Sequence, residues 1–224
     1  MIRQDGAMAS ASGSASSADE ASVRPGLRER KKARTRADIQ AQTLRLIEEQ
    51  GYAATTVEQI AEACEISPST FFRYFRNKEE AAVADFMDAA VFEAAVAAPA
   101  ELDPIQALGH GLRTVMGAMS DEDWQRELRR GRLIQTVPEL QRGLMEEMAR
   151  PLELSVLAVA TRLGLPPDSL EARMYGSALV GGLLGLVIPG HAGELPSVPV
   201  SRDLALAMLD EGLALLGTML NPPA

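Results

Sequence analysis

Cysteine and histidine are scarce in this 224-residue sequence, and the patterns typical of enzymes are absent. The single cysteine, Cys64, excludes an internal disulfide and indicates a reducing compartment. The two histidines, His110 and His191, do not stand at metal-ligand spacing with each other, with Cys64 or with carboxylates. A G-x-S-x-G elbow, a Walker phosphate loop and a G-x-G-x-x-G turn are all missing. We therefore expect no catalytic residue, no bound metal, no cofactor and no enzymatic activity.

Apolar runs long enough to cross a membrane are also missing. The most hydrophobic stretch, Ser177 to Gly190, is shorter than the roughly 20 residues that a transmembrane helix requires. Residues 1–26 are rich in Ala, Ser and Gly, and no apolar segment follows Arg3, so they predict neither a signal peptide nor an anchor. Because such a segment cannot bury enough surface to offset its chain entropy, we expect a disordered tail and no membrane partner.

Acidic residues outnumber basic ones, giving a net charge of −9, but the imbalance is uneven along the chain. Residues 24–78 carry 11 Lys and Arg against 7 Asp and Glu, a net +4, whereas residues 79–224 carry 10 against 21, a net −11. Six basic side chains lie between Arg28 and Arg36. This run is either the solvated start of a helix or an arm that contacts phosphates or a minor groove. A basic head before an acidic body favours the second interpretation, because it would orient the protein on a polyanion.

The chain is organised around Thr55 to Glu80, TTVEQIAEACEISPSTFFRYFRNKEE, which predicts two short helices and the start of a third. Thr56 and Gln59 have the spacing of a reciprocal helix cap. After a corner, Ser67-Pro68 provides a second cap, followed by proline at the first helical position, where its missing N–H costs nothing. The stretch therefore predicts two helices joined by a tight turn.

The second of these helices has an inner and an outer face. Phe71 and Phe75 are four residues apart and are expected in the core. The neighbouring side chains are expected to face outward or sideways: Ser69, Thr70, Phe72, Arg73 and Tyr74. Such an arrangement predicts a helix-turn-helix that reads DNA, with Arg73 able to bind guanine O6 and N7.

Helical periodicity continues beyond this motif, and no alternating strand pattern of useful length occurs. Gly51 is expected to end the first helix, and Pro151 to kink or divide a later one. Besides the two short helices, we expect helices at residues 34–50, 77–98, 104–119, 122–137, 139–163, 169–187 and 202–220, with a loop at 188–200. The predicted fold is all-α with about nine helices, arranged as a tail (1–26), a three-helix head (27–80), a connecting helix (81–98) and a helical body (99–224).

Small residues recur at every fourth position of the expected helix at 169–187. Because the side chains on this helix face are so small, another backbone can approach it closely. That backbone could belong to the same chain or to a second copy. The last helix carries more Leu and Met than one core face needs, which favours a four-helix interface between two copies. The predicted dimer interface comprises Ser177, Gly181, Gly185, Leu209, Leu213 and Leu216.

The pattern T-T-V-x-x-I-A-x-x-C-x-I-S-x-x-T-F-F-x-Y-F-x-N-K-E-E resembles the N-terminal module of the TetR (tetracycline repressor) family over roughly residues 30–90. The resemblance implies a homodimer that binds double-stranded DNA at a near-palindromic operator, in most members as a repressor. Phe72 stands where the family usually has tyrosine, so we expect stacking or contact with a thymine methyl in place of a phenolic contact. Three of the candidates, Thr56, Pro68 and Lys78, would position the DNA backbone. The predicted DNA-binding residues are Arg34, Thr56, Pro68, Ser69, Thr70, Phe72, Arg73, Tyr74 and Lys78.

Members of the family commonly bind a small molecule between the helices of the body, and the resemblance implies the same here. Flexible methionines and aromatic rings with one polar end suit an adaptable apolar pocket, although ordinary core packing would also explain each of them. The candidate ligand-binding residues are Met116, Met119, Trp124, Leu128, Met145, Met148 and Tyr175.

Together these features predict a ligand-responsive repressor of the bacterial cytoplasm, associated with the nucleoid and released from its operator by a small apolar or amphipathic effector. One alternative is an activator, or a structural or recruiting DNA-associated factor, without such an effector. Another is a small-molecule-binding protein that has lost DNA binding, and the intact motif argues against it.

Overall fold

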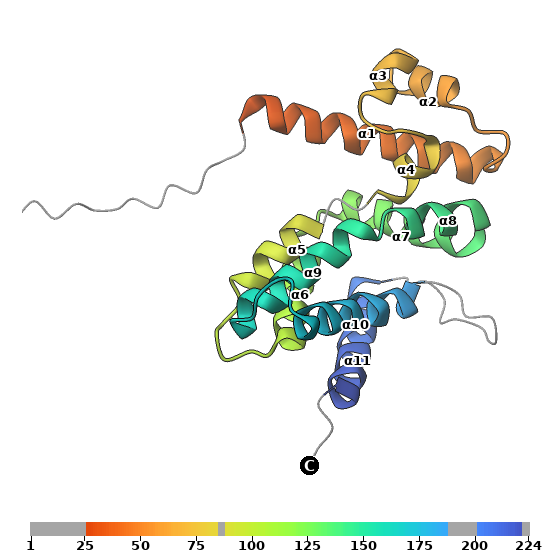
Figure 1. Cartoon of the computed structure of the whole chain (residues 1–224). Coiled ribbons are helices and arrows are strands. Elements are labelled where there is room, and N and C mark those ends of the chain that lie inside the picture. Colours follow the sequence, from red (N-terminus) through yellow and green to blue (C-terminus); the bar gives the residue numbers. More distant parts are fainter. Residues whose placement is uncertain (1–25, 85–87, 188–200, 221–224) are drawn as a thin grey trace, which may run out of the picture.

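The computed structural model describes residues 26–84, 88–187 and 201–220, and these ranges are predominantly helical (Figure 1). Eleven helices and no strand occur in this part of the chain, which confirms the predicted all-α class. The helices are α1 (Leu27–Gln50), α2 (Val57–Ala63), α3 (Pro68–Phe72), α4 (Lys78–Val83), α5 (Asp88–Val96), α6 (Pro104–Ala118), α7 (Asp121–Thr136), α8 (Pro138–Glu146), α9 (Ala149–Leu163), α10 (Leu170–Val187) and α11 (Arg202–Leu220). None of these helices is long and apolar enough to cross a membrane. The predicted tail, apart from Gly26, and the predicted loop at 188–200 lie outside the described residues.

An N-terminal head is built on α1, which lies between the α2–α3 pair and the rest of the molecule (Figure 1). Ile39 of α1, Ile60 of α2 and Phe71 of α3 meet in a common core, where each is fully buried. As predicted, α1 ends before Gly51, whose φ of +86° suits glycine and whose N–H donates to the carbonyl oxygen of Ile47 at 2.9 Å. The head is thus held by one small apolar core.

The start of α1 differs from the prediction. The helix begins at Leu27, not at Arg34, so the basic run from Arg28 to Arg36 is itself helical. Its side chains from Leu27 to Arg34 are exposed, and this end of α1 extends beyond the α2–α3 pair (Figure 1). Because cations near a helix N-terminus oppose the helix dipole, this charge is not arranged to stabilise the helix.

The single connecting helix predicted at 77–98 is wrong. Helix α4 ends at Val83, because Ala84 has φ −50° and ψ 126°, and the next helix begins at Asp88. The carbonyls at the end of α4 are satisfied by side chains from elsewhere in the chain. Gln40 Nε2 donates to the carbonyl oxygen of Ala84 at 2.7 Å, and Arg130 Nη1 to that of Val83 at 3.2 Å. These hydrogen bonds stabilise a helix end at this position.

Pro151 divides the predicted helix at 139–163, as expected. Helix α8 ends at Glu146, and α9 begins at Ala149. Pro151 is the third residue of α9, in the first turn, where no intrahelical partner for its missing N–H is required. This division and the break after α4 raise the number of helices from about nine to eleven.

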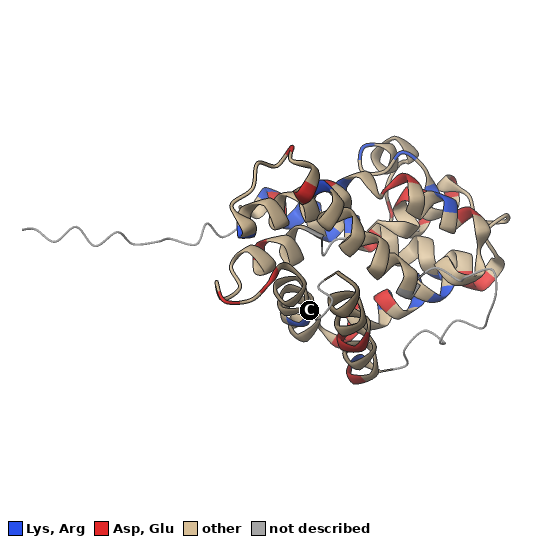
Figure 2. Cartoon of the chain, turned by 60° about the horizontal axis from the view of Figure 1, so that its bottom comes forward, with Lys and Arg blue, Asp and Glu red and all other residues tan. Residues whose placement is uncertain are grey.

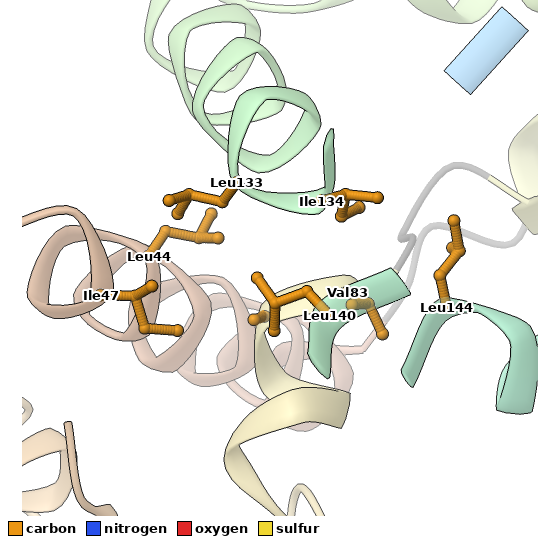
Figure 3. Packing of buried hydrophobic residues seen from close by; sticks show 8 residues of the cluster. Leu44, Ile47, Val83, Leu133, Ile134, Leu140 and Leu144 are labelled. Carbon is orange, nitrogen blue, oxygen red and sulfur yellow. The ribbon is translucent and has the colours of Figure 1, made fainter. Parts of the chain in front are cut away.

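A junction core joins the head to the body, and Figure 3 shows its side chains converging from α1, α4, α7 and α8. It contains Leu44 and Ile47 of α1, Ala82 and Val83 of α4, Leu133 and Ile134 of α7, and Leu140 and Leu144 of α8. All eight are buried, so moving the head against the body would expose apolar surface. The angle between the head and the body is therefore set largely by this cluster.

The body comprises α5 to α11, and α7 and α8 of the body form its side of the junction core. Helix α5 packs on α6 and α9, α9 packs on α10, and α11 closes against α6 and α10. Two crossings require glycine because the backbones lie so close. A Cβ on Gly111 of α6 would lie 2.6 Å from the carbonyl oxygen of Val91, and one on Gly176 of α10 would lie 2.7 Å from the backbone of Val156.

Replacing Gly111 by alanine is expected to destabilise the protein by about 1–3 kcal/mol, because the backbone of α5 must move away from the new methyl group. Gly117→Ala on the same helix is the matched control. No atom lies within 4 Å of a Cβ at that position, so the better helix former is expected to stabilise by roughly 0.5–1 kcal/mol. Denaturant unfolding followed by circular dichroism at one protein concentration measures both. Equal effects of the two variants would contradict the close crossing.

Candidate nucleic-acid interface and ligand cavity

The first helix of the motif is fixed by the predicted reciprocal cap. Thr56 Oγ1 accepts a hydrogen bond from the Gln59 N–H at 3.3 Å, and Gln59 Oε1 accepts one from the Thr56 N–H at 3.0 Å. At the corner, Glu65 adopts the left-handed region with φ +55°, which lets the N–H of Ile66 reach the carbonyl oxygen of Ala61 at 2.9 Å. The corner sets the angle between α2 and α3 at the cost of an unfavourable backbone conformation for glutamate.

The second helix begins with the predicted serine cap. Ser67 Oγ accepts a hydrogen bond from the N–H of Thr70 at 3.1 Å, and Pro68 occupies the first helical position. Helical hydrogen bonding continues to Phe75, whose N–H donates to the carbonyl oxygen of Phe71 at 3.0 Å. Both rings are buried, as expected, so the opposite face of α3 points away from the head.

The predicted DNA-binding residues around α3 differ in exposure. Thr56, Pro68, Ser69, Phe72 and Arg73 are exposed, and the Phe72 ring is 55% accessible. Thr70 and Tyr74 are half-buried. The Arg73 guanidinium lies 5.4 Å from the centre of the Tyr74 ring. The outer face of α3 thus presents hydroxyls, an accessible ring and a cation to the solvent.

The projecting end of α1 meets the end of α3 across a basic hollow. Its lining consists of Arg28, Glu29, Lys31, Lys32, Arg73 and Tyr74. Arg34, the basic residue predicted to contact DNA from this region, lines a different groove, which separates α1 from α8 and α9. The basic residues of α1 that share a hollow with the recognition helix are therefore Arg28, Lys31 and Lys32. Sequence reasoning located the basic run but not its inward face, because the start of the helix was placed too late.

Arg36 holds the end of α3 against α1. Its Nη1 donates to the carbonyl oxygen of Tyr74 at 3.2 Å, and its guanidinium lies 4.5 Å from the centre of the Phe75 ring. Lys78 holds the loop between α1 and α2. Its Nζ donates to the carbonyl oxygens of Tyr52 at 2.7 Å and Thr55 at 2.8 Å, which uses two of its three donors.

The Tyr52 hydroxyl and the Cys64 thiol, both in the head, have raised pKa values. Burial, and then the neighbouring carboxylate of Glu79, raise the pKa of Tyr52, whose hydroxyl donates to that carboxylate. Burial raises the pKa of the Cys64 thiol to about 11. Because the thiolate is the reactive form, Cys64 is poorly suited to redox sensing and acts as a small apolar residue of the head core.

The body contains an apolar cavity of about 180 Å³ between α5, α6, α9 and α10. Its lining residues are Val91, Phe92, Ala95, Pro104, Ala107, Leu108, Leu112, Pro151, Leu154, Ser155, Ala158, Val159, Arg162, Leu179, Val180 and Leu183. The guanidinium of Arg162 donates to four backbone carbonyl oxygens between Ala95 and Leu102 at 2.6–3.2 Å. Because its terminal nitrogens are used in this way, the cavity is lined mainly by hydrocarbon.

None of the seven candidate ligand-binding residues lines this cavity. Trp124 and Leu128 are buried on α7, Met145 is exposed on α8, and Met148 packs against the junction core. Met116 and Tyr175 pack against the body core, which is the buried cluster of Ile105, Val159, Leu179, Leu209 and Leu213. Met119 lines a shallow hollow beside α5. Apart from Phe92 and Arg162, the cavity is lined by aliphatic residues, Pro, Ala and Ser at helix crossings, and the described residues that line it include no Met, Trp or Tyr, so the methionine and aromatic pattern pointed elsewhere.

The predicted dimer residues fall into two groups. Gly181 and Gly185 lie on an open face of α10, since a Cβ at either position would meet no atom within 4 Å. Leu209 and Leu213 are instead buried in the body core of the same chain. Leu216 is partly buried against that core. Ser177 is half-buried on α10 and lies two residues before Leu179, which belongs to the core. The leucines of α11 named by sequence are therefore used mainly within the protomer.

Two short capped helices on a supporting helix, with a polar and basic outer face, define the helix-turn-helix class of DNA-binding proteins. The family model for bacterial regulatory proteins of the tetR family matches residues 39–83, and the model for the MftR C-terminal domain matches residues 102–221, over half of the chain. The chain belongs to the TetR family of bacterial regulatory proteins. Members of this family are DNA-binding transcriptional regulators and not enzymes.

The chain is also similar to individual proteins. The HTH-type transcriptional regulator TcmR of Streptomyces glaucescens is 40% identical over 136 residues, and the match spans 58% of each chain. The crystal structure of Thermus thermophilus FadR, a TetR family transcriptional repressor in complex with lauroyl-CoA, has a TM-score of 0.50 at 22% identity, covering 84% of this chain and 97% of that one. A TetR-family regulator from Mesorhizobium loti gives a TM-score of 0.46 at 20% identity, covering 84% and 98%.

Glu65→Gly is expected to stabilise the protein by about 1 kcal/mol, because glycine adopts the left-handed conformation of the corner without steric cost. Glu62→Gly, three residues earlier within α2, provides the matched control and is expected to destabilise by a similar amount. Thermal or denaturant unfolding of the full chain gives both values. Destabilisation by the change at Glu65 would contradict the backbone geometry of the corner.

Proposed function

We propose that the protein is a homodimeric transcriptional repressor that binds a near-palindromic operator and is released by a small molecule bound in the body. The observation that carries this proposal is the exposed outer face of α3 beside the basic hollow at the start of α1. A dimer would place two such faces on two half-sites about one helical turn apart. The repressor role is supported by the Thermus thermophilus neighbour of the same fold, which is itself a repressor.

Within each half-site, Arg73 would bind guanine, and the accessible ring of Phe72 would contact a thymine methyl. Ser69 and Thr70 lie on the same short helix. Their hydroxyl oxygens are within 3.0 Å of the Oγ atom of Ser67, the residue that caps this helix. Arg28, Lys31 and Lys32 would bind phosphates beside the half-site, because phosphate neutralisation supplies most of the sequence-independent affinity. In this proposal α3 gives specificity and the start of α1 gives affinity.

Two-fold pairing would involve the apolar surface of α10 and α11, at the end of the molecule away from α2 and α3 (Figure 1). Exposed large side chains lie on both helices beside the open glycines of α10: Leu170, Met174, Leu204, Leu215 and Met219. Figure 2 shows the helices around the C-terminus mostly in tan, with few charged residues. Helix α10 has no charged residue after Arg173, and α11 carries only Arg202, Asp203, Asp210 and Glu211. We define these exposed residues with Gly181 and Gly185 as the proposed dimer surface. Leu209 and Leu213 are not part of it.

The body cavity is the proposed effector site. Its lining of α5, α6, α9 and α10 favours an apolar molecule, and lauroyl-CoA in the Thermus thermophilus neighbour supports a ligand with an apolar part. Helix α5 follows α4 in the chain, so a ligand that moves α5 would act on the end of the helix that anchors the head. If effector and operator are coupled, each weakens the binding of the other by the same factor.

Arg73→Ala is expected to reduce the preference for the operator over random DNA by about 10- to 100-fold, because a bidentate contact to guanine is lost. Lys31→Ala combined with Lys32→Ala is expected to keep that preference but to lower the slope of log affinity against log salt by about two, since two phosphate contacts are lost. Fluorescence anisotropy on DNA selected from a random pool, with random DNA as competitor, measures both quantities.

Arg30→Ala is the control, because Arg30 carries the same charge on the same helix but does not line the basic hollow. It is expected to leave the salt slope nearly unchanged. If the wild-type protein bound the selected DNA and random DNA equally well, the result would contradict the repressor proposal and favour a structural or recruiting DNA-associated factor. An equal change of slope for Arg30→Ala would remove the role given to the hollow.

Leu215→Glu is expected to convert the dimer to a monomer at micromolar concentration, because a carboxylate would be buried without a partner in the proposed dimer surface. Leu27→Glu, which alters a leucine that is also exposed but lies in the head, is expected to leave the mass unchanged. Sedimentation equilibrium or light scattering distinguishes the two. A monomeric wild-type protein would contradict the proposed pairing.

A further inference from the structure

A groove separates the head from the body, and its walls carry more positive than negative charge. Arg34 and Arg36 of α1 line one wall, and Arg150 of α9 lines the other together with Arg126 of α7. Its two carboxylates, Glu80 and Glu147, both pair with Arg76, which is not part of the lining. The carboxylates inside the groove are therefore engaged by an arginine outside it, and none of them pairs with Arg34 or Arg150.

Two of these arginines are available for a ligand. Within the described ranges, no hydrogen bond or ion pair links the side chain of Arg34 or of Arg150 to another residue, and both side chains are exposed. Arg126 pairs with Asp123 through Nη2, but its Nε is buried and has no hydrogen-bond partner. Unpaired cations on facing walls, together with a buried donor without an acceptor, favour an anion with several oxygen atoms.

The floor of the groove is apolar and leads toward the body cavity. Val83, Leu144 and Met148 form part of the floor, and Pro151 lines both the groove and the cavity. On α5, Ala89 borders the groove, whereas Val91, two residues later, borders the cavity. A cationic site and a hydrocarbon site therefore lie next to each other along the first turns of α5 and α9.

We propose that this groove binds the anionic group of an amphipathic effector, a phosphate or carboxylate held between Arg34 and Arg150, while the apolar part of the molecule enters the body cavity. This inference rests on the proposed effector site and names its ligand class. A neutral apolar molecule would fill only the cavity and leave the two arginines unpaired. An anion without an apolar part would forgo the burial of hydrocarbon.

The position of the site gives it a regulatory consequence. Arg34 belongs to the head and Arg150 to the body, and Ala84, where α4 ends, also lines the groove. An anion bound to both arginines would link the head directly to the body beside the C-terminal end of α4. The bound effector therefore favours one orientation of the head over another. The operator affinity can change only by the factor by which the effector affinity differs between these two orientations.

The test uses three probes on the full-length protein by titration calorimetry: octyl phosphate below its micelle concentration, 1-octanol and inorganic phosphate. We expect octyl phosphate to bind at least about tenfold more tightly than either of the others, because it alone makes both kinds of contact. Arg150→Ala is expected to remove most of this advantage without weakening the binding of 1-octanol. Arg142→Ala on α8, an exposed arginine outside the groove, is the control and is expected to change neither value.

Operator affinity is measured in parallel with and without octyl phosphate. A shift in the wild type that is lost in Arg150→Ala supports the regulatory role of the groove. Three results would overturn the inference. They are equal binding of octyl phosphate by wild type and Arg150→Ala, an equal loss of binding in Arg142→Ala, and no binding by the wild type. Inorganic phosphate binding as tightly as octyl phosphate would overturn its amphipathic part. Failure of the wild type to bind any operator counts against the proposed function alone, because the probe titrations need no DNA.

Discussion

The arrangement of the molecule depends on the burial of one short helix between the head and the body. Ala82 and Val83 of α4 are enclosed by α1 on one side and by α7 and α8 on the other. Apolar burial supplies most of the free energy of this contact but little direction. The direction comes from Gln40 and Arg130, which donate to the last carbonyls of α4 from the head and from the body respectively. The outer face of α3 can be aimed only because this helix is held from both sides.

Much of the head could be predicted from sequence because its determinants are local. The reciprocal cap at Thr56, the serine cap before Pro68 and the spacing of Phe71 and Phe75 each involve residues within four positions of one another. Such features depend on backbone geometry that neighbouring residues decide. The division at Pro151 is predictable for the same reason, since a missing N–H acts on its own helix.

The features that sequence reasoning missed depend on contacts between distant residues. The end of α4 is stabilised by side chains more than forty positions away, so its local periodicity gave no warning of the break. The body cavity arises where four helices cross, and its lining has no common residue type. Leu209 and Leu213 satisfied an apolar pattern, but a pattern cannot tell whether the covering surface belongs to the same chain or to a second copy. Arg34 belongs to the basic run that the sequence identifies. The face of α1 on which it lies depends on where the helix starts, and it lines the groove beside α8 and α9.

The length of α1 has a mechanical consequence. Its 24 residues form a rod of about 36 Å that is packed along its C-terminal half and bare at its N-terminal end. A rod held at one end acts as a lever, and the displacement of its free tip grows in proportion to the distance from the pivot. A tilt at Leu44 and Ile47 too slight to disturb their packing would therefore move the lysines at the tip through a much larger arc. Small rearrangements in the junction core would thus be converted into larger displacements of the exposed, basic end of α1.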